Sequence, residues 1–256
     1  MKPTGDGGKR ICTLRNLLFV FLFMCSWLQG FAQKRDVQLW FDHQLTYAFK
    51  NRYTLENVST YQTVLDADYK WRNFGISPSF EYVLIPWIDL TSEVSLTYTQ
   101  QDDAVNSFDI APMIGARFHL TQNKRIDTRF LIRHQTRFFR QIEEEDWQVS
   151  NRTRLRGEVY ISINGPNLFT DKLWYCFLDY EEFLVLDEQV DERFANRRRA
   201  RIGLGYRLNY KHRFELSYTV QSSRNELDDG FIRNDDVIQA RYKIYLNPAR
   251  PAGEDD

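Results

Sequence analysis

Hydrophobic and polar residues alternate with a period of two along most of this chain. The clearest example runs from Arg197 to Gln221. Its apolar positions are Ala200, Ile202, Leu204, Tyr206 and Leu208, followed by Phe214, Leu216, Tyr218 and Val220. Polar residues and glycines occupy the positions between them. This alternation predicts a pair of β-strands, each with one apolar and one polar face, joined as an antiparallel hairpin.

The parity of these strands sets the register of the hairpin. Arg207 and Glu215 have to share the polar face, so we predict that the connecting loop is Tyr210–His212. This loop places Arg207 opposite Glu215 and Arg201 opposite Gln221. The polar face of the hairpin would then pair an arginine with a glutamate across the strands.

The same pattern fills nearly the whole chain of 256 residues. We predict about eleven strands, at 37–49, 52–65, 69–84, 87–99, 108–120, 125–139, 149–163, 172–186, 197–210, 212–224 and 235–246. Strands in soluble proteins usually have about five or six residues, whereas a bilayer requires roughly 9 to 11 tilted residues. We therefore expect an all-β fold, an antiparallel transmembrane β-barrel with its apolar face toward lipid and its polar face inward. Bacterial barrels have an even number of strands, which predicts about ten or twelve.

The first part of the chain has a different character. Basic residues at positions 2, 9, 10 and 15 precede the apolar run Leu17–Leu28, and Gly30–Ala32 form a small-x-small cleavage site before Gln33. The apolar run is too short to cross a bilayer as a helix. We therefore predict a cleaved secretory signal peptide at residues 1–32 and an outer-membrane β-barrel domain at residues 33–256. Cys176 is then the only cysteine of the mature chain, and the alternation places it on the lipid-facing side.

Long polar connections alternate with short ones between the predicted strands. The long segments are 100–107, 141–148, 187–196 and 225–234, and the short turns lie near Ile85, Asn123, Asn164 and Lys211. Outer-membrane barrels have short periplasmic turns, longer outside loops, and girdles of aromatic residues at both interfaces. Aromatic residues near strand ends here are Trp87, Tyr98, Phe108, Trp174 and Tyr210. We therefore expect the bacterial outer membrane as the location, with residues 247–256 in the periplasm.

Arginines recur at every second position on several of these strands. The residues predicted to line the interior are Arg129, Arg133, Arg137, Arg152, Arg154, Arg156, Arg197, Arg199, Arg201, Arg207, Arg241 and Lys243, with the carboxylates Glu158, Asp179, Glu181 and Glu215. Rings of arginine favour anions in a pore. A small barrel can also be filled by paired charges, and the cost of unpaired buried guanidiniums favours this second interpretation. We therefore expect a largely filled lumen, in a protein with an envelope-structural or small-solute transport role.

Composition and motifs argue against several other classes of function. The 34 basic and 35 acidic residues are dispersed, which gives no basis for nucleic-acid binding. The sequence shows no metal-binding or nucleotide-binding motif, so we expect no cofactor.

His119 with Thr121 and His134 with Thr136 approximate the H-x-S spacing of outer-membrane lipid hydrolases. Threonine is a poor substitute for that serine, so we expect no enzymatic activity. The acidic run Glu143–Asp146 is interpreted as a solvated outside loop.

Several segments resemble a known bacterial family. They are VQLWFDHQLTY from residue 37, SPSFEYVLIPWIDL from residue 77, RFLIRHQTRFF from residue 129, RTRLRGEVYI from residue 152, FANRRRARIGLGYRLN from residue 194 and FELSYTVQ from residue 214. In these segments the chain is similar to the family catalogued as domain of unknown function 2490. The resemblance implies an outer-membrane β-barrel of a Gram-negative bacterium and no catalytic residues. As partners we expect outer-membrane lipids and the barrel-insertion machinery. A barrel-borne lipid-modifying hydrolase and a soluble periplasmic β protein are the alternatives.

Overall fold

The computed structural model describes residues 36–65, 70–101, 106–122, 124–143, 146–185, 196–224 and 232–247. The predicted signal peptide at 1–32 lies outside the described residues. Among the residues that are described, no helix is long and apolar enough to cross a membrane, and this finding is silent on β-barrels.

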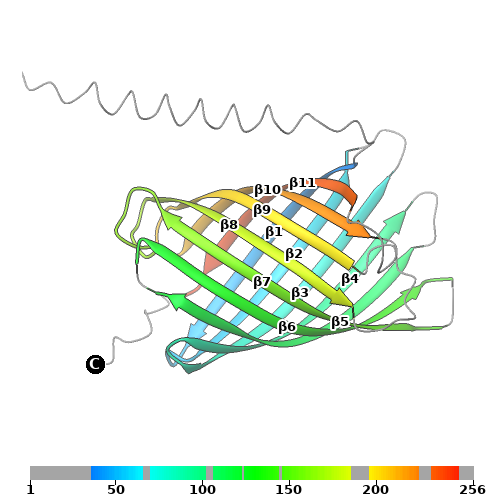
Figure 1. The fold of residues 1–256 in the computed structure, drawn as a ribbon, viewed down its shortest axis with the longest axis horizontal. Helices are drawn as coiled ribbons and strands as arrows, with labels where there is room; N and C mark the ends of the chain where they lie inside the picture. Colours follow the sequence, from blue (N-terminus) through cyan, green and yellow to red (C-terminus); the bar gives the residue numbers. More distant parts are fainter. Residues whose placement is uncertain are drawn as a thin grey trace, which may run out of the picture. The chain divides into compact units, whose positions relative to one another are not determined.

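The described residues form a closed barrel in which each strand pairs antiparallel with its neighbour in sequence (Figure 1). The strands are β1 (Asp36–Phe49), β2 (Tyr53–Val64), β3 (Trp71–Ile85), β4 (Ile88–Gln101), β5 (Ser107–Thr121), β6 (Ile126–Gln141), β7 (Gln148–Ser162), β8 (Leu173–Val185), β9 (Asn196–Arg207), β10 (His212–Arg224) and β11 (Ile232–Tyr245). Their length and their unbroken alternation follow from the period of two in the sequence. The all-β barrel predicted from that period is confirmed.

The number of strands differs from the even number that we expected. Eleven strands are formed by the described residues, where ten or twelve were predicted. In an up-and-down order the first and last strands of an odd set run in the same direction, so the barrel closes through a parallel pair. In this pair, Asp42 of β1 lies opposite Arg241 of β11, and Leu45 lies opposite Ile244. The parallel β1–β11 pair is called the seam below.

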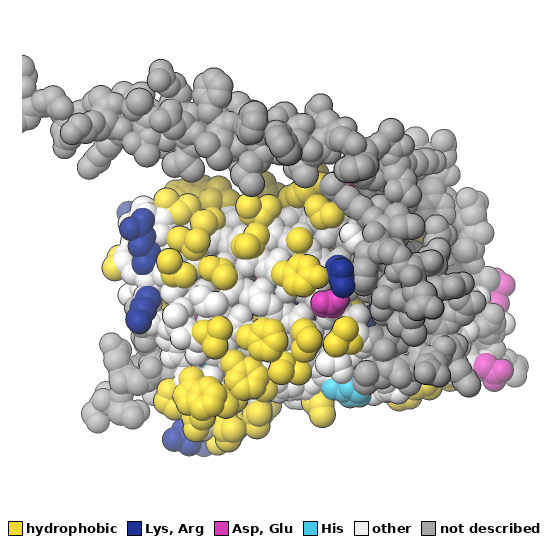
Figure 2. Space-filling model, in the orientation of Figure 1, with side chains coloured by type: hydrophobic (Ala, Val, Ile, Leu, Met, Phe, Trp, Pro, Cys, Tyr) yellow, Lys and Arg dark blue, Asp and Glu magenta, His cyan; other side chains and the backbone are white. Residues whose placement is uncertain are grey.

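The wall of the barrel has its polar side chains inside and its apolar side chains outside. On the outer face, Ile114, Leu216 and Leu178 are 67%, 60% and 56% exposed. On the inner face, Asp179 and Glu181 are only 6% and 4% exposed. Figure 2 shows hydrophobic side chains spread over the outside of the strands. The faces predicted from alternation are therefore confirmed, and the partly buried Cys176 lies on the outer face opposite exposed Leu204.

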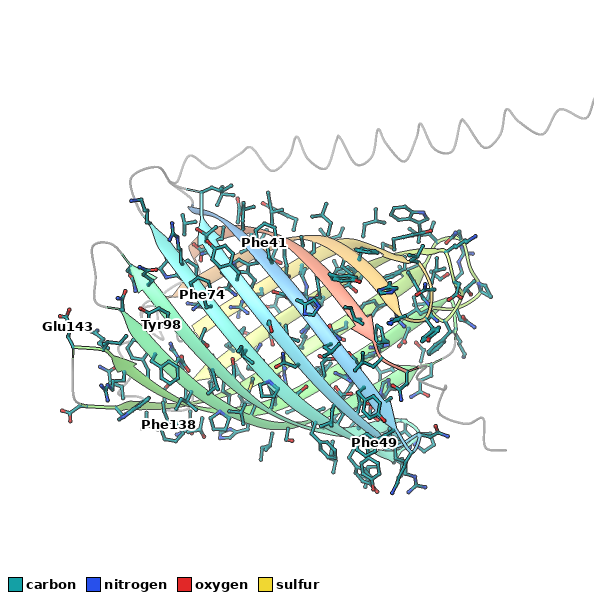
Figure 3. The ribbon with its side chains drawn as sticks, turned by 180° about the vertical axis from the view of Figure 1, so that it is seen from behind. Phe41, Phe49, Phe74, Tyr98, Phe138 and Glu143 are labelled. Carbon is teal, nitrogen blue, oxygen red and sulfur yellow. The ribbon has the colours of Figure 1, made fainter. Side chains whose placement is uncertain are left out.

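Aromatic side chains on the outer face gather toward both ends of the strands. Toward the end that carries Glu143, the rings of Phe41, Tyr61 and Phe74 follow one another, with centroids 6.4 Å and 5.1 Å apart. Figure 3 shows Phe41 and Phe74 together with Tyr98 toward this end, and Phe49 toward the other. Near Phe49, a second series contains Tyr47, Phe49, Tyr53, Phe80 and Tyr82. Two separated aromatic bands are typical of a barrel that meets two membrane interfaces.

Short connections mark one end of the barrel, as predicted, with one exception. The β1–β2, β3–β4, β5–β6 and β9–β10 connections are all short, whereas the β7–β8 connection, expected to be a short turn near Asn164, covers residues 163–172. It is held by its own hydrogen bonds, since Asn164 Oδ1 accepts from Trp174 N at 2.7 Å and Ser162 Oγ donates to Gly165 O at 2.6 Å. This connection places Leu168 against the interior of the barrel, as described below.

Candidate functional site: the charged lumen

The predicted interior residues all lie at inward-facing positions of their strands. Because alternate residues of a strand point to the same face, one assignment per strand fixes the rest. The assignment is supported by ion pairs that join side chains from strands that are not neighbours, such as Arg133 of β6 with Glu93 of β4 at 3.5 Å. Between neighbouring strands, Arg137 of β6 pairs with Asp109 of β5. The pairings of these side chains come from the structure.

Glu181 is the centre of one group of these charges. Its carboxylate lies 2.8 Å from Arg154 Nη2, 3.1 Å from Arg133 Nη2 and 3.9 Å from Arg199 Nη1. A fourth arginine, Arg152, donates from Nε to the neutral Gln135 Oε1 at 2.6 Å. Arg133, Arg152, Arg154 and Arg199 are called the arginine cluster below.

The ring of Phe183 holds three members of the arginine cluster together. The guanidinium carbons of Arg154, Arg199 and Arg152 lie 4.7, 4.9 and 5.2 Å from its centroid. Cations within about 6 Å of an aromatic face are attracted by the ring quadrupole. Arg199 also lies 5.5 Å from the ring of Trp40 and donates from Nε to Gln221 Oε1 at 2.6 Å.

Ion pairs join the members of a second group of charges. Asp179 accepts from Arg201 Nε at 2.6 Å and lies 3.5 Å from Arg156, which itself contacts Glu158 at 2.8 Å. Asp42 accepts from Arg241 Nη2 at 2.8 Å. The Asp42–Arg241 pair spans the seam, so an ion pair inside the lumen accompanies the backbone pairing that closes the barrel.

A third group lies toward the end with the short turns. Glu215 lies 2.7 Å from Lys243 Nζ and accepts from Tyr175 Oη at 2.7 Å. Arg129 donates to Asp127 at 2.8 Å and stands over the ring of Tyr160. Opposite charges in this part of the lumen are therefore closely matched.

The predicted pairing of Arg207 with Glu215 is wrong. In the structure Arg207 lies opposite Arg213, Glu215 lies opposite Gly205, and the β9–β10 loop falls one residue earlier than predicted. The cause is Asn209, whose Oδ1 accepts from the backbone N–H groups of both Lys211 and His212 at 2.9 Å. Asparagine side chains commonly stabilise turns in this way. Because the register shifts by two residues, each side chain keeps its predicted face.

The same register shift changes the other partners of this hairpin. Arg201 lies opposite Thr219, and Gln221 lies opposite Arg199. Arg207 instead contacts the β7–β8 connection, donating to Leu168 O at 3.1 Å and to Asp171 Oδ1 at 3.4 Å. Arg207 therefore anchors that connection rather than pairing within the hairpin.

Apolar side chains fill the lumen near this connection. Leu173, Tyr175 and Phe177 form a buried cluster, and Tyr160 and Leu168 pack against it. Gly203 and Gly205 lie directly opposite Phe177 and Tyr175. A Cβ at either glycine would lie 2.2 Å from the facing ring, so the absence of a side chain lets each ring lie on the neighbouring backbone.

The opposite wall of the lumen carries small uncharged side chains. Ser77 and Ser79 of β3 and Ser95 and Thr97 of β4 line a cavity of about 350 Å³. Arg154, Arg156, Arg199, Arg201 and Arg241 line the same cavity from the other wall. Carboxylates line the cavity as well, so hydroxyl, guanidinium and carboxylate groups all face the remaining space; the carboxylates are Asp42, Glu56, Glu93, Asp179 and Glu181.

The histidine pairs that suggested hydrolysis are not brought together as a catalytic site. His119 faces the lumen, where its Nε2 lies 2.6 Å from Asp89 Oδ2, and Thr121 Oγ1 donates to Ile126 O in a turn. His134 is on the outer face, but Thr136 donates to Asn151 Oδ1 at 2.8 Å. The acidic run 143–146 lies partly outside the described residues.

Several residues of the lumen network were not singled out from the sequence. They are Trp40, Glu56, Gln135, Phe183 and Gln239. Alternation alone would have placed Phe183 inward, since it continues the series Asp179 and Glu181 on β8. In the sequence, no comparable pattern marks a neutral glutamine as the hydrogen-bond partner of an arginine.

Comparisons with known proteins agree with the resemblance found in the sequence. A family model described as "Protein of unknown function (DUF2490)" matches residues 37–231. No curated protein matches the chain. Among solved structures, LpxR from Salmonella typhimurium is similar with a TM-score of 0.48 and 9% sequence identity, over 76% of this chain and 83% of that chain. A similarity at this level carries no conclusion about function.

Proposed function

Since the chain belongs to the DUF2490 family of proteins of unknown function, we propose its role from its own structure. Residues 33–256 form a β-barrel of the bacterial outer membrane, exported by the signal peptide at 1–32 and in contact with outer-membrane lipids. Its lumen is largely filled with charged side chains. Of the envelope-structural and small-solute roles, the arginines favour the handling of small anions by a barrel that is not a general pore.

The observation that carries this proposal is the distribution of side chains across the wall. Large apolar residues such as Ile114, Leu178 and Leu216 are more than half exposed on the outer face. Soluble monomers rarely expose contiguous apolar patches larger than a few hundred Å². Embedding the outer face in lipid removes this surface from water, and the polar lumen then stays hydrated or paired inside. The comparisons give no positive indication of catalytic activity, so no reaction is proposed.

Cys176 provides a test of the membrane location. We expect the protein in the outer-membrane fraction, resistant to extraction by carbonate or high salt. In that fraction, a charged maleimide should label Cys176 slowly and a membrane-soluble maleimide should label it readily, because the side chain lies on the outer face beside Leu204. Recovery from the soluble periplasm, or rapid labelling by the charged reagent in intact membranes, would rule out the lipid-facing assignment.

Planar-bilayer recordings test the filled lumen. We expect low steady conductance from the native protein, with any residual current biased toward anions. The physical reason is that the paired charges around Asp179 and Glu215 and the apolar cluster around Phe177 occupy most of the space between the walls. Barrels of about eight strands are just filled by side chains, and an aqueous channel appears only in much larger ones. A large ohmic current that prefers cations would contradict this account.

A further inference from the structure

Among the described residues, positive charge is in local excess at the level of Phe183. Glu181 is the carboxylate shared by Arg133, Arg154 and Arg199, and within the described part of the chain only Arg133 of these also approaches Glu93. The guanidinium groups of Arg152, Arg154 and Arg199 all lie within 5.2 Å of the centroid of one ring, that of Phe183. Like charges repel more strongly inside a protein than in water. This level of the lumen therefore differs from the closely matched pairs around Asp179 and Glu215.

The neutral partners of the arginine cluster preserve this excess. Arg152 donates to Gln135, and Arg199 donates to Gln221, each at 2.6 Å. Each amide oxygen orients a guanidinium group and leaves its charge in place. A glutamate at either position would neutralise that charge. Each of these bonds uses one of the five N–H donors that a guanidinium group carries.

The surroundings of the arginine cluster form a place where an acceptor fits. The cavity of about 350 Å³ is lined by two members of the cluster, Arg154 and Arg199, together with the carboxylates Glu93 and Glu181, and by Ser95 and Thr97 on the facing wall. Within the described residues, the buried Nε of Arg133 has no hydrogen-bond partner. Phe183 fixes three guanidinium groups around one ring, so little further ordering is needed on binding.

We propose that the arginine cluster binds a small soluble oxyanion that carries at least two negative charges, of which phosphate is the simplest. The planar fork of arginine matches the oxygen geometry of phosphate and carboxylate groups. The cluster lies on the inner face of a closed wall, so its ligand arrives through water in the lumen and not from a lipid headgroup in the bilayer. This inference deepens the proposed function, but it requires only the folded barrel, so its failure leaves the membrane location standing.

Thermal unfolding of the full chain in a non-ionic detergent tests the site. We expect sodium phosphate to raise the unfolding temperature by about 5 °C or more at saturating concentration, relative to sodium chloride at matched ionic strength. Pyrophosphate should act at lower concentration than phosphate because it carries more charge. Equilibrium dialysis with labelled phosphate should show binding that pyrophosphate displaces and that chloride does not.

Substitution of two arginines locates the site. The double variant R152Q/R199Q removes two guanidinium groups whose Nε donors bind neutral glutamines, and Glu181 keeps Arg133 and Arg154 as ion-pair partners. In chloride it should unfold at the same temperature as the native protein or higher, because repulsion is relieved, and it should lose the phosphate response. The matched control is R198Q, at an adjacent outward position of the same strand, which should keep the full response.

Two results would overturn the proposal. One is an unfolding temperature that responds equally to phosphate and chloride in the native protein, together with no saturable binding in dialysis. The other is a phosphate response that persists unchanged in R152Q/R199Q. If the double variant does not fold, the dialysis measurement on the native protein still decides between binding and no binding.

Discussion

Replacing Glu181 by glutamine is expected to lower the free energy of unfolding by about 3 to 5 kcal/mol. Glu181 is 4% exposed and lies within ion-pair distance of Arg133, Arg154 and Arg199. Without its charge, the arginine cluster would keep its mutual repulsion in a site of low dielectric constant. Denaturant unfolding of the detergent-solubilised protein measures the loss. Phosphate should recover part of it, since an added anion would replace the missing carboxylate.

The neighbouring residue provides the matched control. Glu182 points to the outer face, where it lies 2.9 Å from Arg198 with 29% of its side chain exposed. Exposed ion pairs contribute about 0 to 1 kcal/mol, so Glu182→Gln should change the free energy of unfolding by no more than this. Equal losses from the two substitutions would show that Glu181 does not balance a buried cluster.

Replacing Gly203 or Gly205 by alanine is expected to cost about 1 to 3 kcal/mol of stability each. The added Cβ would lie 2.2 Å from the ring of Phe177 or Tyr175. Neither ring can move freely, because Tyr160 and Leu168 pack against the same cluster. The free energy of unfolding is therefore lowered because the aromatic packing is displaced, and denaturant unfolding would measure the loss.

Gly157 is the control for this pair of substitutions. A Cβ at Gly157 meets nothing within 4 Å, so Gly157→Ala should be neutral or stabilising by about 0.4 to 1 kcal/mol. The clash can also be relieved from the other side, since Gly203→Ala should cost less in a Phe177→Leu background than alone. Additive effects of those two changes would argue against contact between the ring and the glycine.

The sequence alone predicted the strands and their faces because both depend on local periodicity. Alternation placed Arg199 and Arg201 inward and Leu204 outward, and the structure agrees. The predicted Arg207–Glu215 pair failed because a short-range contact, the Asn209 side chain with two backbone N–H groups, set the turn. Parity survives such an error, since a shift of two residues leaves every face unchanged.

The partners inside the lumen could not be predicted in the same way. Arg133 reaches Glu181 from a strand two positions around the barrel, and this distance depends on strand tilt and closure, which alternation does not encode. The packing of Leu168 against the buried apolar cluster depends on the path of the β7–β8 connection. The predicted strand number was wrong because we applied the even-number rule for bacterial barrels, although the alternation itself indicated about eleven strands.

The parallel seam determines at which rim of the barrel the first strand starts and the last strand ends. β1 starts at the rim that carries the long connections, whereas β11 finishes at the rim that carries the short turns. An even-stranded barrel releases both chain ends from one rim, but here they leave from opposite rims. In a bilayer, Asp36 and Tyr245 would lie toward opposite faces of the membrane. Insertion from the periplasm would then have to carry the start of β1 across the membrane together with the long connections, while the end of β11 stays on the periplasmic side.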